Sequence, residues 1–332
     1  MIIETIQNID PVELDKIVSF YDAICYQAGS RHVIITESKV QSLDSSFQHL
    51  VDRAVPVPND IQLASRAYRS KVRKVALGPV EIGDDTGNTV FISGPCSVES
   101  ESQIVQMSEK LVACGIKILR AGCFKPRTSP YSFQGMGLDG LKLLTEMRER
   151  FGLAVITEVR DSTHVDSVIE HTDIIQVGAK AMYDHGILRA CGQARKPVLL
   201  KRGFGTTLKE FVQAAEFVLS GGNENVVLCE RGIRTFETST RFTLDLCGVA
   251  FIKKETNLPV IVDPTHAMGF AYGVPDLTRA STAMGIDGLL IEAHPIPQEA
   301  KSDAAQQLDL DELDVLRKSL DAVAASVRRK IV

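Results

Sequence analysis

Basic side chains gather in one short stretch of the sequence, directly after an apolar run. The stretch, residues 118–135, reads ILRAGCFKPRTSPYSFQG and carries Arg120, Lys125, Arg127 and Thr128. Guanidinium and ammonium groups beside a hydroxyl are donors that proteins use to hold phosphate and carboxylate oxygens. The alternative is a solvated basic loop, because runs of like charge commonly lie on the surface. The stretch therefore predicts an anion site, provided that further cations converge on it.

Other apolar runs along the chain also end in a charged or metal-binding side chain. These runs are TVFISGP, KILRAGC, LAVITEV, DIIQVGA, PVLLKRG, NVVLCER, LPVIVDP and GLLIEAHP. Segments with apolar residues at helical spacing separate them, and ELDVLRKSLDAVAASVRRK follows the last one. Strands that alternate with helices in this way predict a (β/α)8 barrel, a TIM barrel of the α/β class, over residues 89–332. A doubly wound sheet is the alternative, but GPCSVES after the first run is not the GxGxxG fingerprint.

The residues at the ends of the predicted strands are candidates for the active site, because active sites of such barrels lie at the carboxyl ends of the strands. In chain order these residues are Cys96, Arg120, Lys125, Arg127, Thr128, Glu158, Lys180, Lys201, Arg202, Arg231, Arg234, His266, Glu292 and His294, with Asp303 in the loop after the last strand. Two kinds of chemistry are superposed in this set.

The first is metal binding. A thiol, an imidazole and two carboxylates, from Cys96, His266, Glu292 and Asp303, suit Mn, Fe, Co or Zn better than Mg or Ca. Their spacing is not diagnostic, since they come from different strands and no CxxC or HExxH motif supports them. A packed cysteine and a hydrogen-bonded histidine remain the alternative.

The second is anion binding by Arg120, Lys125, Lys180, Lys201 and Arg231. So many like charges in one barrel mouth are costly without compensation, so the substrate should be polyanionic. A small acid that carries both carboxylate and phosphate would balance them, and a second phosphate would bind at Arg127 and Thr128. Glu158, among these cations, is either a structural counter-ion or a direct contact to substrate or water.

Composition narrows the class of protein. The chain has 332 residues, 44% of them hydrophobic and 24% charged, which fits one barrel with an appendage. No apolar run approaches the roughly 20 residues of a membrane span, and the N-terminus lacks a secretory pattern, so we expect a cytoplasmic protein. Seven cysteines, an odd number, indicate reduced thiols, and a net charge of −5 argues against a nucleic-acid partner.

Residues 1–70 predict a small α+β module. MIIETI and RHVIITES are expected as strands, and a helix should run from Pro11, capped by Asp10, to Gly29. SLDSSFQHLVDRA predicts a second, shorter helix. Residues 71–88 then read as a connection and a hairpin, within VALGPVEIGDDTGNTVF, that would plug or cap the barrel.

Eight segments of the chain match, in order, those of a known enzyme family. They are GPCSVES, LRAGCFKPRTSPYSFQGMGLDGL, VGAK, PVLLKRG, LCERGIRTFE, VDPTH, IEAHP and KSDAAQQL. Across residues 89–332 the chain resembles the 3-deoxy-D-arabino-heptulosonate 7-phosphate (DAHP) synthases, type I, β subgroup. KPRTSPYSFQG is close to a signature of that subgroup, whereas the sister synthases of 3-deoxy-octulosonate 8-phosphate usually carry Ala-Asn-Arg after the lysine.

The resemblance implies a metal-dependent condensation of phosphoenolpyruvate with erythrose 4-phosphate, the first step of the shikimate pathway to aromatic amino acids. It implies metal ligation by Cys96, His266, Glu292 and Asp303, and a phosphoenolpyruvate clamp of Arg120, Lys125, Lys180, Lys201 and Arg231. It also implies contacts from Arg127 and Thr128 to the aldose phosphate. Lys125 is expected to protonate the new alkoxide or to hold its neighbour, and Glu158 or a metal-bound water to assist the addition of water.

Two departures from the family pattern leave the identity of the aldose open. Position 180 is Lys where the family usually has Arg, and AMGFAYGVPDL follows His266 where a basic stretch is common. The alternatives are an octulosonate- or sialate-type synthase, a paralogue of specialised metabolism, and a non-catalytic barrel that binds amino acids. The module resembles the ferredoxin-like appendage of some members, which binds aromatic amino acids; otherwise it is an assembly or lid element. We expect a homotetramer or homodimer.

Overall fold

The computed structural model describes residues 1–125, 129 and 131–332. The predictions for Arg127 and Thr128 therefore lie outside the described residues.

Within the described residues, eight parallel strands close into a barrel. They are β7 (Asn88–Gly94), β8 (Ile118–Arg120), β9 (Ala154–Val159), β10 (Ile174–Val177), β11 (Val198–Lys201), β12 (Val226–Glu230), β13 (Val260–Val262) and β14 (Gly288–Glu292). The last strand pairs in parallel with the first, from Gly288 opposite Val90 to Glu292 opposite Gly94. A short strand, β15 (Lys330–Ile331), adds to the start of β7. The predicted (β/α)8 barrel is confirmed.

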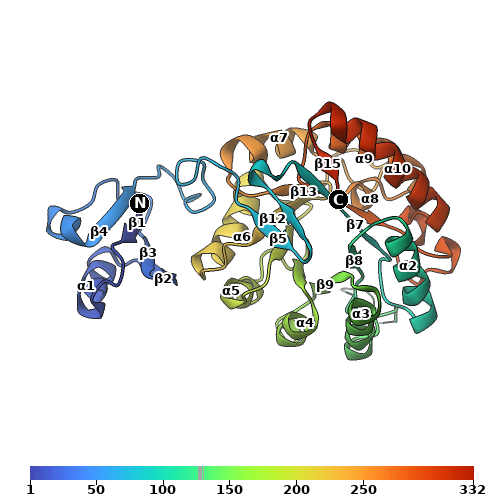
Figure 1. Ribbon diagram of the computed structural model, residues 1–332, viewed down its shortest axis with the longest axis horizontal. Coiled ribbons are helices and arrows are strands. Elements are labelled where there is room, and N and C mark those ends of the chain that lie inside the picture. The colour runs from blue at the N-terminus through green and yellow to red at the C-terminus, as the bar shows by residue number, and fades with distance from the viewer. Residues whose placement is uncertain (126–128, 130) are drawn as a thin grey trace.

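Helices form an outer layer around these strands (Figure 1). They are α2 (Glu101–Ala113), α3 (Leu138–Phe151), α4 (Val165–His171), α5 (His185–Gln193), α6 (Leu208–Ser220), α7 (Leu246–Glu255), α9 (Val274–Ala283) and α10 (Leu310–Ser326). The short helix α8 (Pro264–Met268) is buried after β13, and 3-10 turns occur at η2 (Asp84–Thr86), η3 (Ala271–Gly273), η4 (Pro297–Glu299) and η5 (Ala304–Gln306). Local signals fix where the helices begin. Helix α6 starts at a capping box, in which Thr207 and Glu210 each accept from the other's backbone N–H. Asp309 and Glu312 form the same motif at α10.

The strands are buried on both sides, because successive residues point in opposite directions. Inward-facing Ile92, Ile118 and Ile156 belong to a core inside the barrel, while Phe91 and Leu119 pack outward beneath the helices. This double burial accounts for the near-continuous apolar runs in the sequence. The polar residues at the ends of the strands lie at the mouth of the barrel.

A hairpin closes the barrel at the end opposite the mouth. It pairs β5 (Val75–Leu77) with β6 (Val80–Ile82), and Val75, Leu77 and Ile82 are fully buried in the inner core. Gly78 forms the turn with φ of 58°, and a Cβ there would lie 2.3 Å from Cβ of Ala154, the first residue of β9. The turn thus approaches the amino ends of the strands so closely that it needs glycine.

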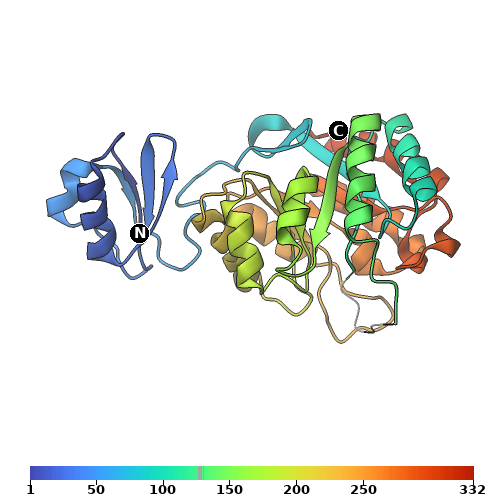
Figure 2. The ribbon, with the colours of Figure 1, turned by 90° about the horizontal axis from the view of Figure 1, so that it is seen from below.

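The N-terminal module is a four-stranded antiparallel sheet with one helix on it. Its elements are β1 (Ile2–Thr5), α1 (Pro11–Tyr21), β2 (Ile24–Ala28), β3 (Arg31–Ile35), the 3-10 turn η1 (Ser45–Leu50) and β4 (Val51–Val55). The sheet order β2-β3-β1-β4 is that of a ferredoxin-like fold, with η1 in place of the second helix. Figure 2 shows the module beside the barrel, joined to it by an extended segment.

The predicted helices of the module were wrong in their extent. The first ends at Tyr21 rather than Gly29, because Asp22 adopts the left-handed conformation with φ of 47° and stops it. Ile24–Ala28 is a strand instead, and Gly29 makes the hairpin turn to β3. The second predicted helix is a 3-10 turn, since the residues from Val51 onward pair with β1. Strand pairing here overrides the local helical pattern.

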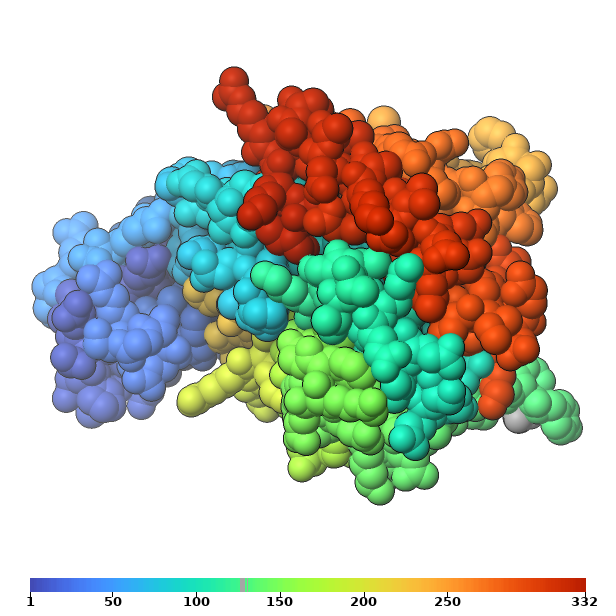
Figure 3. All heavy atoms as spheres, turned by 45° about the vertical axis from the view of Figure 1, so that its right-hand side comes forward, coloured from blue at the N-terminus to red at the C-terminus, as the bar shows by residue number. Residues whose placement is uncertain are grey.

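One face of the module's sheet packs toward the barrel. Ile2, Tyr26 and Val33 belong to the same apolar cluster as the barrel helices, whereas Ile3 and Ile34 pack with α1 on the other face. Figure 3 shows the module beside the connecting segment along one side of the molecule. Among the helices of the described residues, none combines the length and apolar content needed to span a bilayer.

Candidate active site

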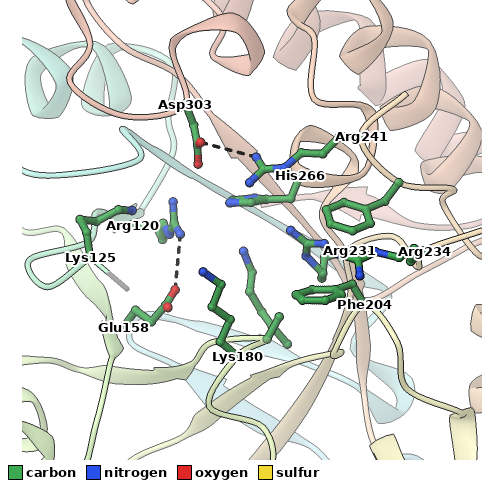
Figure 4. Close-up of a pocket in the computed structure, with 13 residues that line it drawn as sticks. Arg120, Lys125, Glu158, Lys180, Phe204, Arg231, Arg234, Arg241, His266 and Asp303 are labelled. Atoms are coloured by element: carbon green, nitrogen blue, oxygen red, sulfur yellow. Dashed lines mark ion pairs between the residues drawn. The ribbon is translucent and has the colours of Figure 1, made fainter. Parts of the chain in front are cut away.

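A cavity of about 390 Å³ opens at the carboxyl ends of the barrel strands (Figure 4). Its lining residues are Arg120, Lys125, Glu158, Ala179, Lys180, Lys201, Phe204, Arg231, Arg234, Arg241, Phe242, His266 and Asp303. Every cation predicted for phosphoenolpyruvate lines it. Nine of the thirteen described residues predicted from the strand ends thus line one cavity, and Cys96, Arg202, Glu292 and His294 are not part of its lining.

Potential metal donors lie together at one side of this cavity. The ligand atoms of Cys96, Glu292 and Asp303 are all within 4.8 Å of one another. Cys96 Sγ is 3.4 Å from Asp303 Oδ2, and His266 Nε2 is 3.5 Å from Glu292 Oε1. Cys96, Glu292 and Asp303 thus form a candidate metal site, and His266 contacts one of its carboxylates.

The thiol of this cluster is buried beside an ammonium group. Lys125 Nζ lies 3.0 Å from Cys96 Sγ and donates to Cys96 O at 2.9 Å. Burial, with Glu292 adding to it, raises the pKa of Cys96 to about 11. Burial alone would lower the pKa of Lys125, but attraction to the thiolate form of Cys96 and to the carboxylates of Glu158 and Glu292 outweighs it and raises the pKa. Lys125 is therefore a cation at neutral pH, positioned against the metal donors.

The two carboxylates of the cluster are held in their ionised form. Burial opposes this for Asp303, but Arg241 at 3.6 Å, together with His266 and Lys125, lowers its pKa to about 2. For Glu292 the attraction of His266 and Arg120 outweighs burial and lowers the pKa. Two ionised carboxylates give the cluster the charge that a divalent cation requires.

Further side chains fix these carboxylates in place. Glu292 pairs with Arg120 and accepts from Gln306 Nε2 at 2.6 Å. Glu158 accepts from Gln176 and lies 4.0 Å from Arg120. The guanidinium of Arg120 thus connects the carboxylate in the metal-donor cluster with the carboxylate on β9.

A buried aspartate joins the metal-donor side of the cavity to its anion-binding side. Asp263 Oδ2 accepts from Lys201 Nζ at 2.6 Å and contacts His266 Nδ1 at 2.7 Å. Its Oδ1 accepts from the backbone N–H of His266 at 2.9 Å, which caps α8. Burial would raise the pKa of Asp263, but His266 and Lys201 hold it well below its usual range. With Nδ1 engaged in this way, His266 presents Nε2 toward Glu292.

The opposite side of the cavity is basic. Figure 4 shows Lys180 extending into the cavity between Glu158 and Arg231. Arg231 is only 5% exposed, and its Nη1 has no hydrogen-bond partner among the described residues. Burial lowers the pKa of Arg231. A buried guanidinium with a donor to spare is suited to receive an anion.

A family model described as the DAHP synthetase I family matches residues 60–328. The chain belongs to this family. Phospho-2-dehydro-3-deoxyheptonate aldolase of Thermotoga maritima is 41% identical over 297 residues, which cover 90% of this chain and 86% of that protein. The resemblance seen in the sequence motifs is confirmed.

Two solved structures and a relative with a different enzyme name also match this chain. A crystal structure of DAHP synthase from Thermotoga maritima matches with a TM-score of 0.81 and 37% identity, covering 100% of this chain and 99% of that one. A truncated form of that synthase matches with a TM-score of 0.77 and covers 82% of this chain. The 2-dehydro-3-deoxyphosphooctonate aldolase of Geotalea daltonii is 30% identical over 77% of this chain and all of that protein.

Two of the strand-end residues turn away from the cavity of this DAHP synthase family member. Arg202 pairs with Glu230 at 2.9 Å and Asp245 at 2.7 Å, which ties β11 to β12 and to the start of α7. His294 Nδ1 accepts from the backbone N–H of Ile296 at 3.0 Å. These two side chains stabilise the loops rather than line the cavity.

Several residues of the site were missed by reasoning from strand ends. Asp263 had a signal, because Asp before Pro-Thr-His reads as an N-cap followed by Pro at the first helical position. Arg241 and Phe242 had none, since they enter from the middle of a long loop after β12. Phe204, in the loop after β11, reads as an ordinary apolar residue.

Proposed function

We propose that this chain condenses phosphoenolpyruvate with D-erythrose 4-phosphate and water, giving DAHP and inorganic phosphate, as a metal-dependent DAHP synthase. One observation carries the residue assignments: a cluster of metal donors opens directly onto a cavity whose described lining has seven Lys and Arg side chains against the two carboxylates Glu158 and Asp303. An enzyme that must hold two phosphorylated substrates beside a Lewis acid requires this combination.

Cys96, His266, Glu292 and Asp303 are proposed to hold the metal. Their chemistry favours Mn, Fe, Co or Zn over Mg or Ca, because the set includes sulfur and nitrogen. When bound, such an ion polarises the aldehyde oxygen of the second substrate. Cys96 loses its proton on binding, since the thiolate is the ligand form.

Five cations are proposed to bind phosphoenolpyruvate: Arg120, Lys125, Lys180, Lys201 and Arg231. Arg231 and Lys201 reach the cavity from neighbouring strands β12 and β11, and both are buried. Lys201 already shares Asp263 with His266, so it is fixed in position before substrate binds. The anion would complete a charge balance that the protein alone leaves positive.

The condensation joins C3 of phosphoenolpyruvate to the aldehyde carbon. Lys125 Nζ is proposed to give its proton to the oxygen that was the aldehyde, because it is a buried cation beside the metal donors. Water then adds at C2, and the phosphate leaves from the resulting tetrahedral centre. Glu158 either accepts the proton of this water or serves as counter-ion to Arg120, from which it lies 4.0 Å away.

D-erythrose 4-phosphate is proposed as the second substrate because the chain is more similar in sequence to a heptonate aldolase than to an octonate aldolase. Identity to the heptonate aldolase is 41%, against 30% for the octonate aldolase of Geotalea daltonii. Contacts from Arg127 and Thr128 to the aldose phosphate remain a proposal from the sequence alone. A sister activity with a five-carbon aldose phosphate is the second candidate, because Lys180 and the segment after His266 depart from the family pattern.

Three further proposals concern regulation, assembly and a cytoplasmic location. The ferredoxin-like module is proposed to bind an aromatic amino acid that inhibits the enzyme, and the assembly is proposed to be a homodimer or homotetramer. The seven cysteines, all within the described residues, are free thiols, which agrees with a cytoplasmic location.

A steady-state assay with a panel of aldose phosphates tests the proposed reaction. Loss of the enol-phosphate absorbance and release of inorganic phosphate are followed with erythrose 4-phosphate and with arabinose 5-phosphate. We expect turnover with erythrose 4-phosphate and one phosphate released per phosphoenolpyruvate consumed. Lys201→Ala should lose this activity, while Lys209→Ala, an exposed lysine on α6, should keep it. Turnover with arabinose 5-phosphate alone would replace the proposed function with the second candidate.

A further inference from the structure

Two phenylalanine rings stand among the cations of the cavity. Phe204 and Phe242 line it from the loops after β11 and β12, and their rings are stacked with centroids 5.5 Å apart. Three guanidinium groups lie over these rings. Arg231 is 4.4 Å and Arg241 5.9 Å from the centroid of Phe242, and Arg234 is 4.8 Å from that of Phe204.

Arg231 is held differently from the other buried cations of the cavity. Lys201 pairs with Asp263, and Arg120 pairs with Glu292. Arg231 makes no ion pair with any described residue, and its guanidinium lies over the ring of Phe242. The face of an aromatic ring attracts a cation through its quadrupole, and this attraction grows where water is excluded.

For an arginine that must bind an anion, the face of an aromatic ring is a better neighbour than a carboxylate. A carboxylate occupies N–H donors and cancels the charge, so an incoming anion must compete with it. A ring instead attracts the guanidinium without accepting its in-plane hydrogen bonds. The unused Nη1 of Arg231 is consistent with this arrangement.

The backbone brings the ring of Phe242 to Arg231 by close packing. Phe242 N donates to Ala267 O at 2.8 Å, which fixes the loop against α8. Gly232, next to Arg231, has φ of 93°, and a Cβ there would lie 2.7 Å from Cβ of Phe242. Phe204 is tied in as well, because its carbonyl accepts from Arg234 N at 2.6 Å.

We propose that Phe204 and Phe242 are positioning residues, whose stacked rings hold the guanidinium groups of the anion site in place before the anion binds. The effect is largest for Arg231, which is buried, and smaller for Arg234, which is exposed. This role rests on the proposed function in that Arg231 is assigned there to phosphoenolpyruvate.

Substitutions of Phe242 separate the aromatic face from the apolar volume. Phe242→Leu keeps an apolar side chain but removes the face, and Phe242→Tyr keeps the face. We expect Phe242→Leu to raise the KM for phosphoenolpyruvate by about 2- to 30-fold while kcat changes less. The reason is that the contact between Phe242 and Arg231 stabilises the bound substrate and the transition state equally. Phe242→Tyr should restore the KM. Phe236→Leu, on the same loop with a ring 98% exposed, is the matched control and should leave both constants unchanged.

Binding of inorganic phosphate to the same variants tests the inference without the reaction. Phosphate should raise the unfolding temperature of the wild type and of Phe242→Tyr more than that of Phe242→Leu, with a smaller deficit for Phe204→Leu. Equal phosphate affinity of Phe242→Leu and wild type would overturn the proposed role, and so would equal losses in the Leu and Tyr variants. This measurement of phosphate binding tests the role of Phe242 even if the chain does not condense the two substrates. That result would disprove the proposed function but not the binding of an anion at Arg231.

Discussion

Replacing Asp263 by asparagine should damage the site and the fold together. Asp263 is fully buried and serves three donors: Lys201 Nζ, His266 Nδ1 and the backbone N–H of His266. Asparagine has nearly the same shape but carries no charge, and one of its two terminal groups donates rather than accepts. In either orientation of the amide, at least one of these donors loses its acceptor.

The expected magnitude follows from the burial of the pair. The side chain of Lys201 is 3% exposed, so Asp263→Asn leaves its ammonium without a counter-ion in the protein interior. Breaking a buried pair by removing one partner typically costs about 3 to 5 kcal/mol. His266 also loses the carboxylate that orients its ring, and loss of such a partner weakens metal affinity by roughly 10- to 100-fold.

Asp287→Asn provides the matched control. Asp287 is also buried, pairs with Arg329 at 2.9 Å and accepts from Val260 N at 2.9 Å, but it lies just before β14, at the end of the barrel away from the cavity. Arg329 keeps its bonds to Asn88 and Thr89, so we expect a smaller loss of stability and an unchanged Mn²⁺ affinity.

Two measurements decide the outcome. Urea-induced unfolding followed by circular dichroism gives the free energy of unfolding, and calorimetric titration of Mn²⁺ into chelator-stripped protein gives the affinity. An Asp263→Asn variant with the stability and Mn²⁺ affinity of the wild type would refute the reasoning that this carboxylate joins the two sides of the cavity.

Three other predictions concern metal, pH and control. Chelation with EDTA should abolish turnover and Mn²⁺ should restore it, with Cys96→Ser lowering both metal content and rate; full activity of a chelated, metal-free sample would exclude the metal site. Burial raises the pKa of Glu216 to about 7, so the folded protein holds a proton that the unfolded chain releases, and stability should fall as pH rises from about 4.5 to 7, by at most about 3 kcal/mol from this group. Glu216→Gln should remove that share of the pH dependence, and an unchanged slope in urea titrations would contradict the assignment. A chain that begins at Asn59 should stay active and lose any inhibition by tyrosine or phenylalanine, whereas equal inhibition of both chains would place the effector site in the barrel.

The starting point of the shortened chain follows from how the connecting segment packs. Glu216 on α6 accepts from the backbone N–H groups of Gln62, Leu63 and Ala64 at 2.8 to 3.1 Å. The side chain of Asn257 donates to Leu63 O at 2.8 Å. Residues 62–64 are thus bonded to the barrel, and Gln62 also bonds to Met1 and Thr36 of the module.

The barrel could be predicted from the sequence because its periodicity and its chemistry agree. Strands buried on both sides must be apolar throughout, so polar residues such as Glu158 and Lys201 stand out where the strands end. Parallel strands bring those ends to one mouth, and this alone placed the cations and the metal donors around a common space. No contact between particular side chains was needed for that prediction.

Contacts that depend on the packing of loops could not be predicted. Asp263 binds Lys201 across two strands, and Phe242 reaches Arg231 only because the loop after β12 folds back against α8. In the module, the sequence gives no glycine at the true end of α1, and Asp22 takes the left-handed conformation that glycine usually supplies. The predicted helix therefore ran on to Gly29, through residues that pair as β2.

A crystal structure with Mn²⁺ and phosphoenolpyruvate tests the central claim most directly, because that claim is that one cavity joins a metal site to an anion site. Anomalous scattering should place manganese among Cys96, His266, Glu292 and Asp303, with the phosphate of phosphoenolpyruvate against Arg231. A manganese peak away from these four residues, or a phosphate bound outside the cavity, would contradict the account.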